Sequence, residues 1–96
     1  MRGSEGADGA WRKFVGKVVV VDTNSSFVYL GTLTKVSAYF VLLKEVDVHD
    51  RNETPSTKER YVLDTKRHGV RANRKEVSIR KEVVISLSLL DDIVDY

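Results

Sequence analysis

Strand-forming residues dominate the stretch from Phe27 to Val48, FVYLGTLTKVSAYFVLLKEVDV. It is rich in Val, Leu, Phe, Tyr and Thr and contains no proline, a composition typical of β-strands. Its single glycine, Gly31, falls inside a strand, where glycine usually marks a bulge, a bend or a close backbone approach. We therefore predict two long strands that meet at a sharp bend, in a sheet that curves over its own core to make a small barrel.

Three further strands are expected from the same kind of pattern. Lys17–Thr23 contains the unbroken run VVVV, which indicates burial on both faces of the sheet. In Glu76–Arg80 and Val83–Ser88, apolar residues alternate with polar ones, the period of a half-buried strand. Only Lys81 and Glu82 separate these last two strands, too few residues for a crossover, so a tight bend is predicted there.

A helix is predicted over Thr57–His68, in the polar insertion 49–75. Ser56 and Glu59 have the spacing of a capping box, and Gly69 is suited to end the helix in a left-handed conformation. The alternative is a strand over Arg60–Leu63, because Tyr-Val-Leu fits a sheet equally well.

The N-terminus is expected to contribute a tail and one helical turn. Residues 1–10 are Gly-rich and polar, and we predict a disordered tail. Trp11, Phe14 and Val15 follow at helical spacing, with Gly16 as the stop, and this turn is expected to plug one end of the barrel.

Composition bounds the remaining choices. The 96 residues make one domain, assigned to 11–96, and contain no cysteine, which excludes disulfides, thiolate zinc sites and a cysteine nucleophile. No apolar run approaches the roughly 20 residues of a membrane span, and no signal peptide stands out, so a cytoplasmic protein without membrane contact is expected. The apolar tail Leu89–Tyr96 is expected to pack on the barrel or on a neighbouring copy.

The net charge of +2 is small, but it is unevenly distributed. A basic block precedes and includes the predicted tight bend, and an acidic group follows at the C-terminus. A block of this kind can bind phosphate; the alternative is a solvated face of loops and strand edges. The block consists of Lys66, Arg67, Arg71, Arg74, Lys75, Arg80 and Lys81, and the acidic group of Asp91, Asp92 and Asp95.

This arrangement resembles the Sm-like family, including its bacterial Hfq branch. The first family motif matches the stretch from Gly31 and Leu33 to Val41, and YFVLLK over Tyr39–Lys44 is similar to the corresponding Hfq strand. The second motif has its counterpart in Ile79–Lys81 and the alternating strand after it. The resemblance implies a strongly bent, five-stranded antiparallel, SH3-like barrel with an N-terminal helix, here with an inserted helix between strands 3 and 4.

The resemblance also implies single-stranded RNA binding by a six- or seven-membered ring. The family's base-stacking position falls on Tyr39 and its arginine on Arg80. The family's Asp, Asn and Gly are here Ser37, Val41 and Lys81, so the amide that reads a base edge is missing. An aromatic platform beside positive charge remains, which suits binding with little sequence preference.

We therefore predict a homo-oligomeric, Sm-like RNA-binding module. Its expected RNA contacts are Tyr39, Arg80, Lys81, Arg71, Arg74 and Lys75. The alternative is a protein-interaction or scaffolding barrel that has lost the RNA site, as Ser37 and Val41 suggest. The free edges of the final two strands suit pairing with a neighbour.

No enzymatic activity and no cofactor are expected, because no nucleophile with an adjacent base and no phosphate-cradling glycine loop stands out. Asp47, His49 and Asp50 form a small group of potential metal donors. We predict no metal site there, since a strand-end histidine among acids is usually solvated. His68 is interpreted as a cation at a helix C-terminus.

Overall fold

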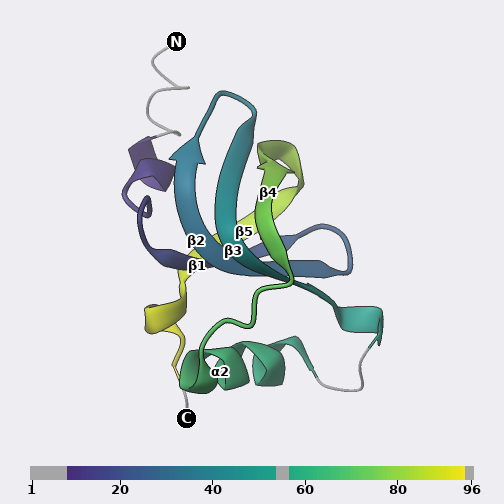
Figure 1. The fold of residues 1–96 in the computed structure, drawn as a ribbon. Coiled ribbons are helices and arrows are strands. Elements are labelled where there is room, and N and C mark those ends of the chain that lie inside the picture. The colour runs from purple at the N-terminus through teal and green to yellow at the C-terminus, as the bar shows by residue number, and fades with distance from the viewer. Residues whose placement is uncertain (1–8, 54–56, 95–96) are drawn as a thin grey trace.

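A curved five-stranded antiparallel sheet forms the body of the protein (Figure 1). The computed structural model describes residues 9–53 and 57–94. Hydrogen-bonded neighbours follow the order β4-β3-β2-β1-β5, so β4 and β5 are the two edges. The strands are β1 (Val18–Thr23), β2 (Phe27–Val36), β3 (Phe40–Asp50), β4 (Arg74–Arg80) and β5 (Val84–Leu89). The predicted mainly β barrel with five antiparallel strands is confirmed.

The long hairpin β2–β3 bends where the sequence places its glycine. Glu45 and Val46 together face Gly31, and Glu45 has a positive φ of 52°, the geometry of a β-bulge. A Cβ at Gly31 would lie 3.0 Å from the Lys44 carbonyl oxygen and 3.1 Å from the Val46 Cα. Glycine is therefore required by a close backbone approach, as predicted.

The alternation of β1 divides its valines between two apolar clusters. Val19 and Val21 are in the barrel core, while Val20 faces the opposite side of the sheet. This confirms burial on both faces of β1. The remaining buried residues of the barrel core are Leu33, Val36, Val41, Leu43, Val46 and Ile79.

The inserted helix α2 (Lys58–His68) covers the outer side of the sheet. Val62 of α2 joins Val20, Val28 and Leu30 in the second cluster, and Leu90 of the C-terminal segment completes it. The tail after β5 thus packs on its own barrel and on α2, one of the two outcomes expected from its apolar residues. In Figure 1, α2 lies at the end of the molecule opposite the tip of the β2–β3 hairpin.

Both ends of α2 have capping residues. The Thr57 side chain accepts a hydrogen bond from the Arg60 N–H at 3.1 Å, so Thr57 is the N-cap rather than the first helical residue. The predicted cap, Ser56, lies outside the described residues. Gly69 ends the helix with a φ of 89°, as expected. The alternative strand over Arg60–Leu63 is wrong, because the apolar side of this segment packs against the sheet as a helix.

Other boundaries differ from the prediction by one to three residues. Arg74 and Lys75 belong to β4, which was predicted to begin at Glu76, because Arg74 pairs with Val46 of β3. At the bend before β5, residues 81–83 form a 3-10 turn, one residue longer than the predicted bend. His49 and Asp50 extend β3, opposite Val28 and Phe27.

The N-terminal turn closes one end of the barrel. Residues 9–12 are helical, so the last two residues of the expected tail are part of the turn, and residues 1–8 lie outside the description. Trp11 and Phe14 pack against the barrel core, whereas Val15 is exposed. Gly16 has a φ of 88° and donates its N–H to the Leu33 carbonyl at 2.7 Å. In the described part of the chain, no helix is long and apolar enough to cross a membrane.

Candidate nucleic-acid interface

The tip of the β2–β3 hairpin presents Tyr39 to solvent. Ser37 shapes the turn, because its N–H donates to the Phe40 carbonyl at 2.9 Å and its Oγ accepts from the Phe40 N–H at 3.2 Å. The Tyr39 side chain is 75% exposed. An aromatic ring held outside the core by a tight turn is available for stacking on a flat ligand.

The turn between β4 and β5 lies directly beside this tip. The Lys81 N–H donates a hydrogen bond to the Tyr39 carbonyl at 2.8 Å, and Phe40 pairs with Arg80 across β3 and β4. Together these two turns form a shallow pocket of about 320 Å³, lined by Ala38, Tyr39, Arg80, Lys81 and Glu82, which we call the barrel-tip site. Three residues predicted to contact RNA are therefore brought together.

Positive charge at the barrel-tip site is partly engaged by neighbouring groups. The Arg80 guanidinium forms an ion pair with Glu82 at 2.5 Å, and both side chains remain about two-thirds exposed. The Lys81 Nζ lies over the Trp11 ring, 5.6 Å from its centroid. Exposed ion pairs contribute little to stability, so Arg80 can exchange Glu82 for another anion at small cost.

The other predicted RNA contacts lie elsewhere. Arg74 and Lys75 begin β4 and Arg80 ends it, which separates the two ends of this strand by roughly 20 Å at about 3.3 Å per residue. Arg71 belongs to the connection between α2 and β4 and lines a different pocket. The basic block of the sequence is thus divided between the two ends of β4.

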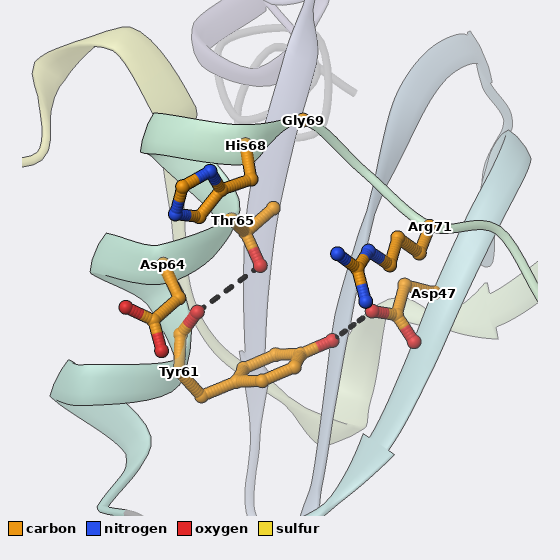
Figure 2. Close-up of a pocket in the computed structure, with 7 residues that line it drawn as sticks. All are labelled: Asp47, Tyr61, Asp64, Thr65, His68, Gly69 and Arg71. Atoms are coloured by element: carbon orange, nitrogen blue, oxygen red, sulfur yellow. Dashed lines mark hydrogen bonds between the residues drawn. The ribbon is translucent and has the colours of Figure 1, made fainter.

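That second pocket has a volume of about 330 Å³ and lies between β3, α2 and the connection after α2 (Figure 2). We call it the helix pocket. The Tyr61 hydroxyl donates a hydrogen bond to Asp47 Oδ2, and the Thr65 hydroxyl donates to the Tyr61 carbonyl at 3.0 Å. Its lining residues are Asp47, Tyr61, Asp64, Thr65, His68, Gly69 and Arg71.

A polar cluster supports one wall of this pocket. The His49 and Tyr61 rings stack with centroids 3.7 Å apart and an interplanar angle of 12°. Asn73 donates to Asp47 Oδ1 at 3.3 Å, and its amide also pairs with the Val48 backbone, accepting at 3.0 Å and donating at 3.1 Å. His49 is therefore packed against an aromatic ring rather than solvated, which corrects the expectation for this histidine.

Two pKa values are perturbed in and beside this cluster. Burial raises the pKa of the Tyr61 hydroxyl, and its hydrogen bond to Asp47 raises that pKa further. The backbone N–H of Asn52, which donates to Asp50 at 3.0 Å, lowers the pKa of the Asp50 carboxyl. Tyr61 consequently remains a hydrogen-bond donor at neutral pH. Within the described ranges, no group of three His, Cys, Asp or Glu residues is arranged to hold a metal ion.

The helix pocket was not predicted from the sequence. Tyr61, Asp64 and His68 recur at i, i+3 and i+7 along α2, so one helical face carries all three toward the pocket. This spacing can be read from the sequence, but the helix prediction rested on the two caps and on the cations of the last turn. Nothing in the sequence indicated that Asp47 lies against the same face.

Comparison with known proteins identifies the architecture. No protein-family model matches the chain, and no curated protein matches it by sequence. Among solved structures, an Sm protein of Pyrococcus abyssii in complex with a uridine heptamer superposes with a TM-score of 0.58 and 17% identity, covering 84% of this chain and 93% of that one. The fold is Sm-like.

A second similar structure is a chain of the NatC complex bound to CoA. It superposes with a TM-score of 0.55 and 18% identity, covering 82% of each chain. The Sm-like fold is thus seen both in an RNA-bound protein and within a complex of proteins, and likeness at this identity shows the fold alone.

Proposed function

We propose that this Sm-like protein binds single-stranded RNA at the barrel-tip site. The observation that carries the proposal is the exposed Tyr39 ring beside Arg80 and Lys81 in one pocket. A base stacked on tyrosine with a cation near its phosphate gives affinity with little dependence on sequence. The uridine heptamer bound to the Pyrococcus Sm protein supports RNA as the ligand class.

The proposal includes assembly into a homo-oligomeric ring. Within the described residues, β4 and β5 each have one strand neighbour, so each has a row of backbone groups without a ladder partner there. Pairing β4 of one copy with β5 of the next satisfies both edges. The helix α2 packs on the face of the sheet against Val20, Val28 and Leu30 and is not hydrogen-bonded into either edge ladder. A ring would repeat a weak RNA site and raise its avidity.

Arg71, Arg74 and Lys75 have a different role in this proposal. They lie toward the opposite end of β4 from Tyr39, so one base cannot contact both groups. We assign them a general electrostatic attraction for the RNA backbone. Substitution of these cations should therefore weaken binding equally for all RNA sequences.

The test is fluorescence anisotropy with short oligo-U and oligo-A RNA across a salt series, with light scattering in the same buffer. Removing Tyr39 and Arg80 together by alanine substitution is expected to weaken binding at least tenfold and to leave the oligomer unchanged, since stacking alone contributes about 1–3 kcal/mol per base. Arg74→Ala is the matched loss of one cation and is expected to weaken binding only slightly. Unchanged affinity in the double variant would refute the barrel-tip assignment, and a monomer would refute the ring.

A protein-complex subunit is the second candidate, and the similar chain within the NatC complex favours it. In that case a partner strand, rather than a second copy, pairs with β4 or β5. The same titrations, together with a pull-down, separate the two candidates. A monodisperse protein that shows no salt-dependent RNA affinity, and that retains one partner in stoichiometric amount, would support the subunit role.

A further inference from the structure

The helix pocket has no role in the proposed function. It is built by the insertion between β3 and β4, and it lies at the opposite end of β4 from the barrel-tip site. Its volume of about 330 Å³ is at the lower end of the range for small-molecule sites, which run from about 300 to 1,000 Å³. Such a volume suits one small, flat, polar group.

One wall of the pocket is fixed before any ligand arrives. Asp47 already accepts hydrogen bonds from the Tyr61 hydroxyl and the Asn73 amide. His49 covers one face of the Tyr61 ring at a centroid distance of 3.7 Å. Asp47 is therefore a support for the pocket rather than its main ligand group.

Three other side chains around the pocket are available to bind a ligand. The side chains of Asp64, His68 and Arg71 form no hydrogen bond or ion pair in the parts of the chain that the structure describes. Figure 2 shows the Arg71 guanidinium extending from the connection after α2 toward the helix, and Asp64 on the helix side of Tyr61. A carboxylate acceptor and a guanidinium donor thus border the same space from different segments.

The charges of the lining decide which ligands fit. The lining contains two carboxylates, Asp47 and Asp64, and one guanidinium, Arg71, so a phosphate or carboxylate group would be repelled. A neutral planar ring that presents donors on one edge and acceptors on another would satisfy both free groups. Guanine has this pattern: its N1–H and N2–H₂ donors suit a carboxylate, and its O6 and N7 acceptors suit arginine.

We propose that the helix pocket binds a guanine base, with Asp64 accepting from N1–H and N2–H₂ and Arg71 donating to O6 and N7. The other three bases do not offer this pair of edges. Adenine has no donor pair for the carboxylate, uracil has one ring donor, and cytosine has only its amino group. A bidentate contact of this kind discriminates by about 5- to 150-fold.

The base can come from a guanine nucleotide or from an RNA strand. The second source rests on the proposed function, with the strand held at the barrel-tip site as well. The first source does not depend on it. The experiment therefore has one arm for each source.

In the first arm, guanosine, adenosine, cytidine and uridine monophosphates are titrated into the full-length protein and followed by amide chemical shifts. We expect guanosine monophosphate to shift residues 61–71 and to bind at least fivefold more tightly than the other three. Asp64→Asn and Arg71→Gln are each expected to remove this preference. Asp91→Asn and Arg74→Gln change the same charges at exposed positions outside the pocket and are expected to preserve it.

In the second arm, oligo-U RNA is compared with an oligomer of equal length that contains one guanosine. Tighter binding of the guanosine oligomer that disappears in Asp64→Asn supports the proposal with RNA as the source, even if the free nucleotide does not bind. Equal binding in both arms, or a preference retained in both Asp64→Asn and Arg71→Gln, would overturn it. Both substituted side chains are exposed, and circular dichroism verifies that the variants fold.

The double alanine variant at Tyr39 and Arg80 separates this inference from the proposed function. If the double variant loses oligo-U binding but keeps the nucleotide-induced shifts at residues 61–71, the barrel-tip assignment and the guanine site are both supported. If wild-type protein fails to bind oligo-U but shows the guanine preference, the helix pocket stands alone and the barrel-tip assignment fails.

Discussion

The backbone N–H of Lys81 donates a 2.8 Å hydrogen bond to the carbonyl oxygen of Tyr39. This bond joins the tip of the β2–β3 hairpin to the turn between β4 and β5, although 42 positions separate the two residues in the sequence. It places an exposed aromatic ring beside two cations without using either cationic side chain. The barrel-tip site is consequently positioned by main-chain contacts, so side-chain substitutions there should change binding more than folding.

The Arg80–Glu82 ion pair supplies a test of the barrel-tip charge. Glu82→Gln removes the acid that competes with phosphate for Arg80, and we expect RNA affinity to rise about two- to fivefold, the range of an exposed ion pair. The slope of log affinity against log salt should steepen, because one more cation is available to phosphate. Anisotropy titrations at several salt concentrations measure both quantities.

Glu59→Gln is the matched control, because Glu59 is exposed on α2 and outside the barrel-tip site. It makes the same change in net charge and should increase affinity much less. Equal gains from the two substitutions would show that only net charge matters and that Arg80 has no local role.

Gly31 is where the sequence and the structure agree in most detail. We expect Gly31→Ala to lower the free energy of unfolding by about 1–3 kcal/mol, because the new Cβ would lie 3.0 Å from the Lys44 carbonyl oxygen and 3.1 Å from the Val46 Cα. Urea denaturation measures the loss. Gly9→Ala is the control, since a Cβ at Gly9 has nothing within 4 Å and should leave stability unchanged or slightly higher. A stable Gly31→Ala variant would mean that the bend relaxes easily.

The strands and the bend were predictable because their signals are local. Alternation, β-branched residues and one interior glycine determine which segments pair and where the sheet turns. The caps of α2 were nearly as clear, with Gly69 correct and the N-cap displaced to Thr57. The predicted strand began at Glu76, two residues after Arg74, because the pairing of Arg74 with Val46 depends on the partner strand.

The helix pocket was not predictable in this way, because its contacts join distant segments. Tyr61 contacts Asp47 and His49 only after α2 docks on the sheet through Val62. The basic block likewise looked continuous in the sequence, but β4 extends through it and separates Arg74 from Arg80 by roughly 20 Å. The resemblance to the Sm-like motifs predicted that Tyr39 and Arg80 lie close together, and they line the same pocket.

The Asp22–Lys58 ion pair is a second attachment of α2 to the sheet. Among the described residues, Lys58 is the only side chain that pairs with the Asp22 carboxylate, which is 14% exposed and whose Oδ1 has no hydrogen bond. Lys58→Met would remove this partner. We expect a loss of about 1–3 kcal/mol in unfolding free energy, below the full penalty of a buried pair because both side chains retain some exposure. Chemical denaturation measures it.

Asp22→Asn provides the other arm of a double-mutant cycle. If the pair stabilises the docked helix, the double variant should be more stable than the sum of the two single losses implies, since no unpaired charge remains. Strict additivity of the two losses would contradict a direct interaction between Asp22 and Lys58.

Tyr61 gives a pH-dependent prediction with a definite sign. Burial and the hydrogen bond to Asp47 raise the pKa of its hydroxyl in the folded protein above the ordinary value of 10.0. Above about pH 10 the unfolded chain therefore releases this proton while the folded chain retains it, so the contribution of Tyr61 to stability is complete below pH 10 and declines as the pH rises. Tyr61→Phe should make the alkaline loss of stability shallower between about pH 10 and pH 12.

The same substitution should lower stability at neutral pH by about 1–2 kcal/mol, because Asp47 loses a hydrogen-bond donor and keeps only Asn73 among the described residues. Tyr29→Phe is the matched control, since the half-buried Tyr29 hydroxyl has no hydrogen bond in the described part of the chain and no such contact to lose. Urea denaturation of the three proteins from pH 7 to pH 12 measures both effects. Parallel stability curves for wild-type protein and Tyr61→Phe above pH 10 would contradict the assigned pKa shift.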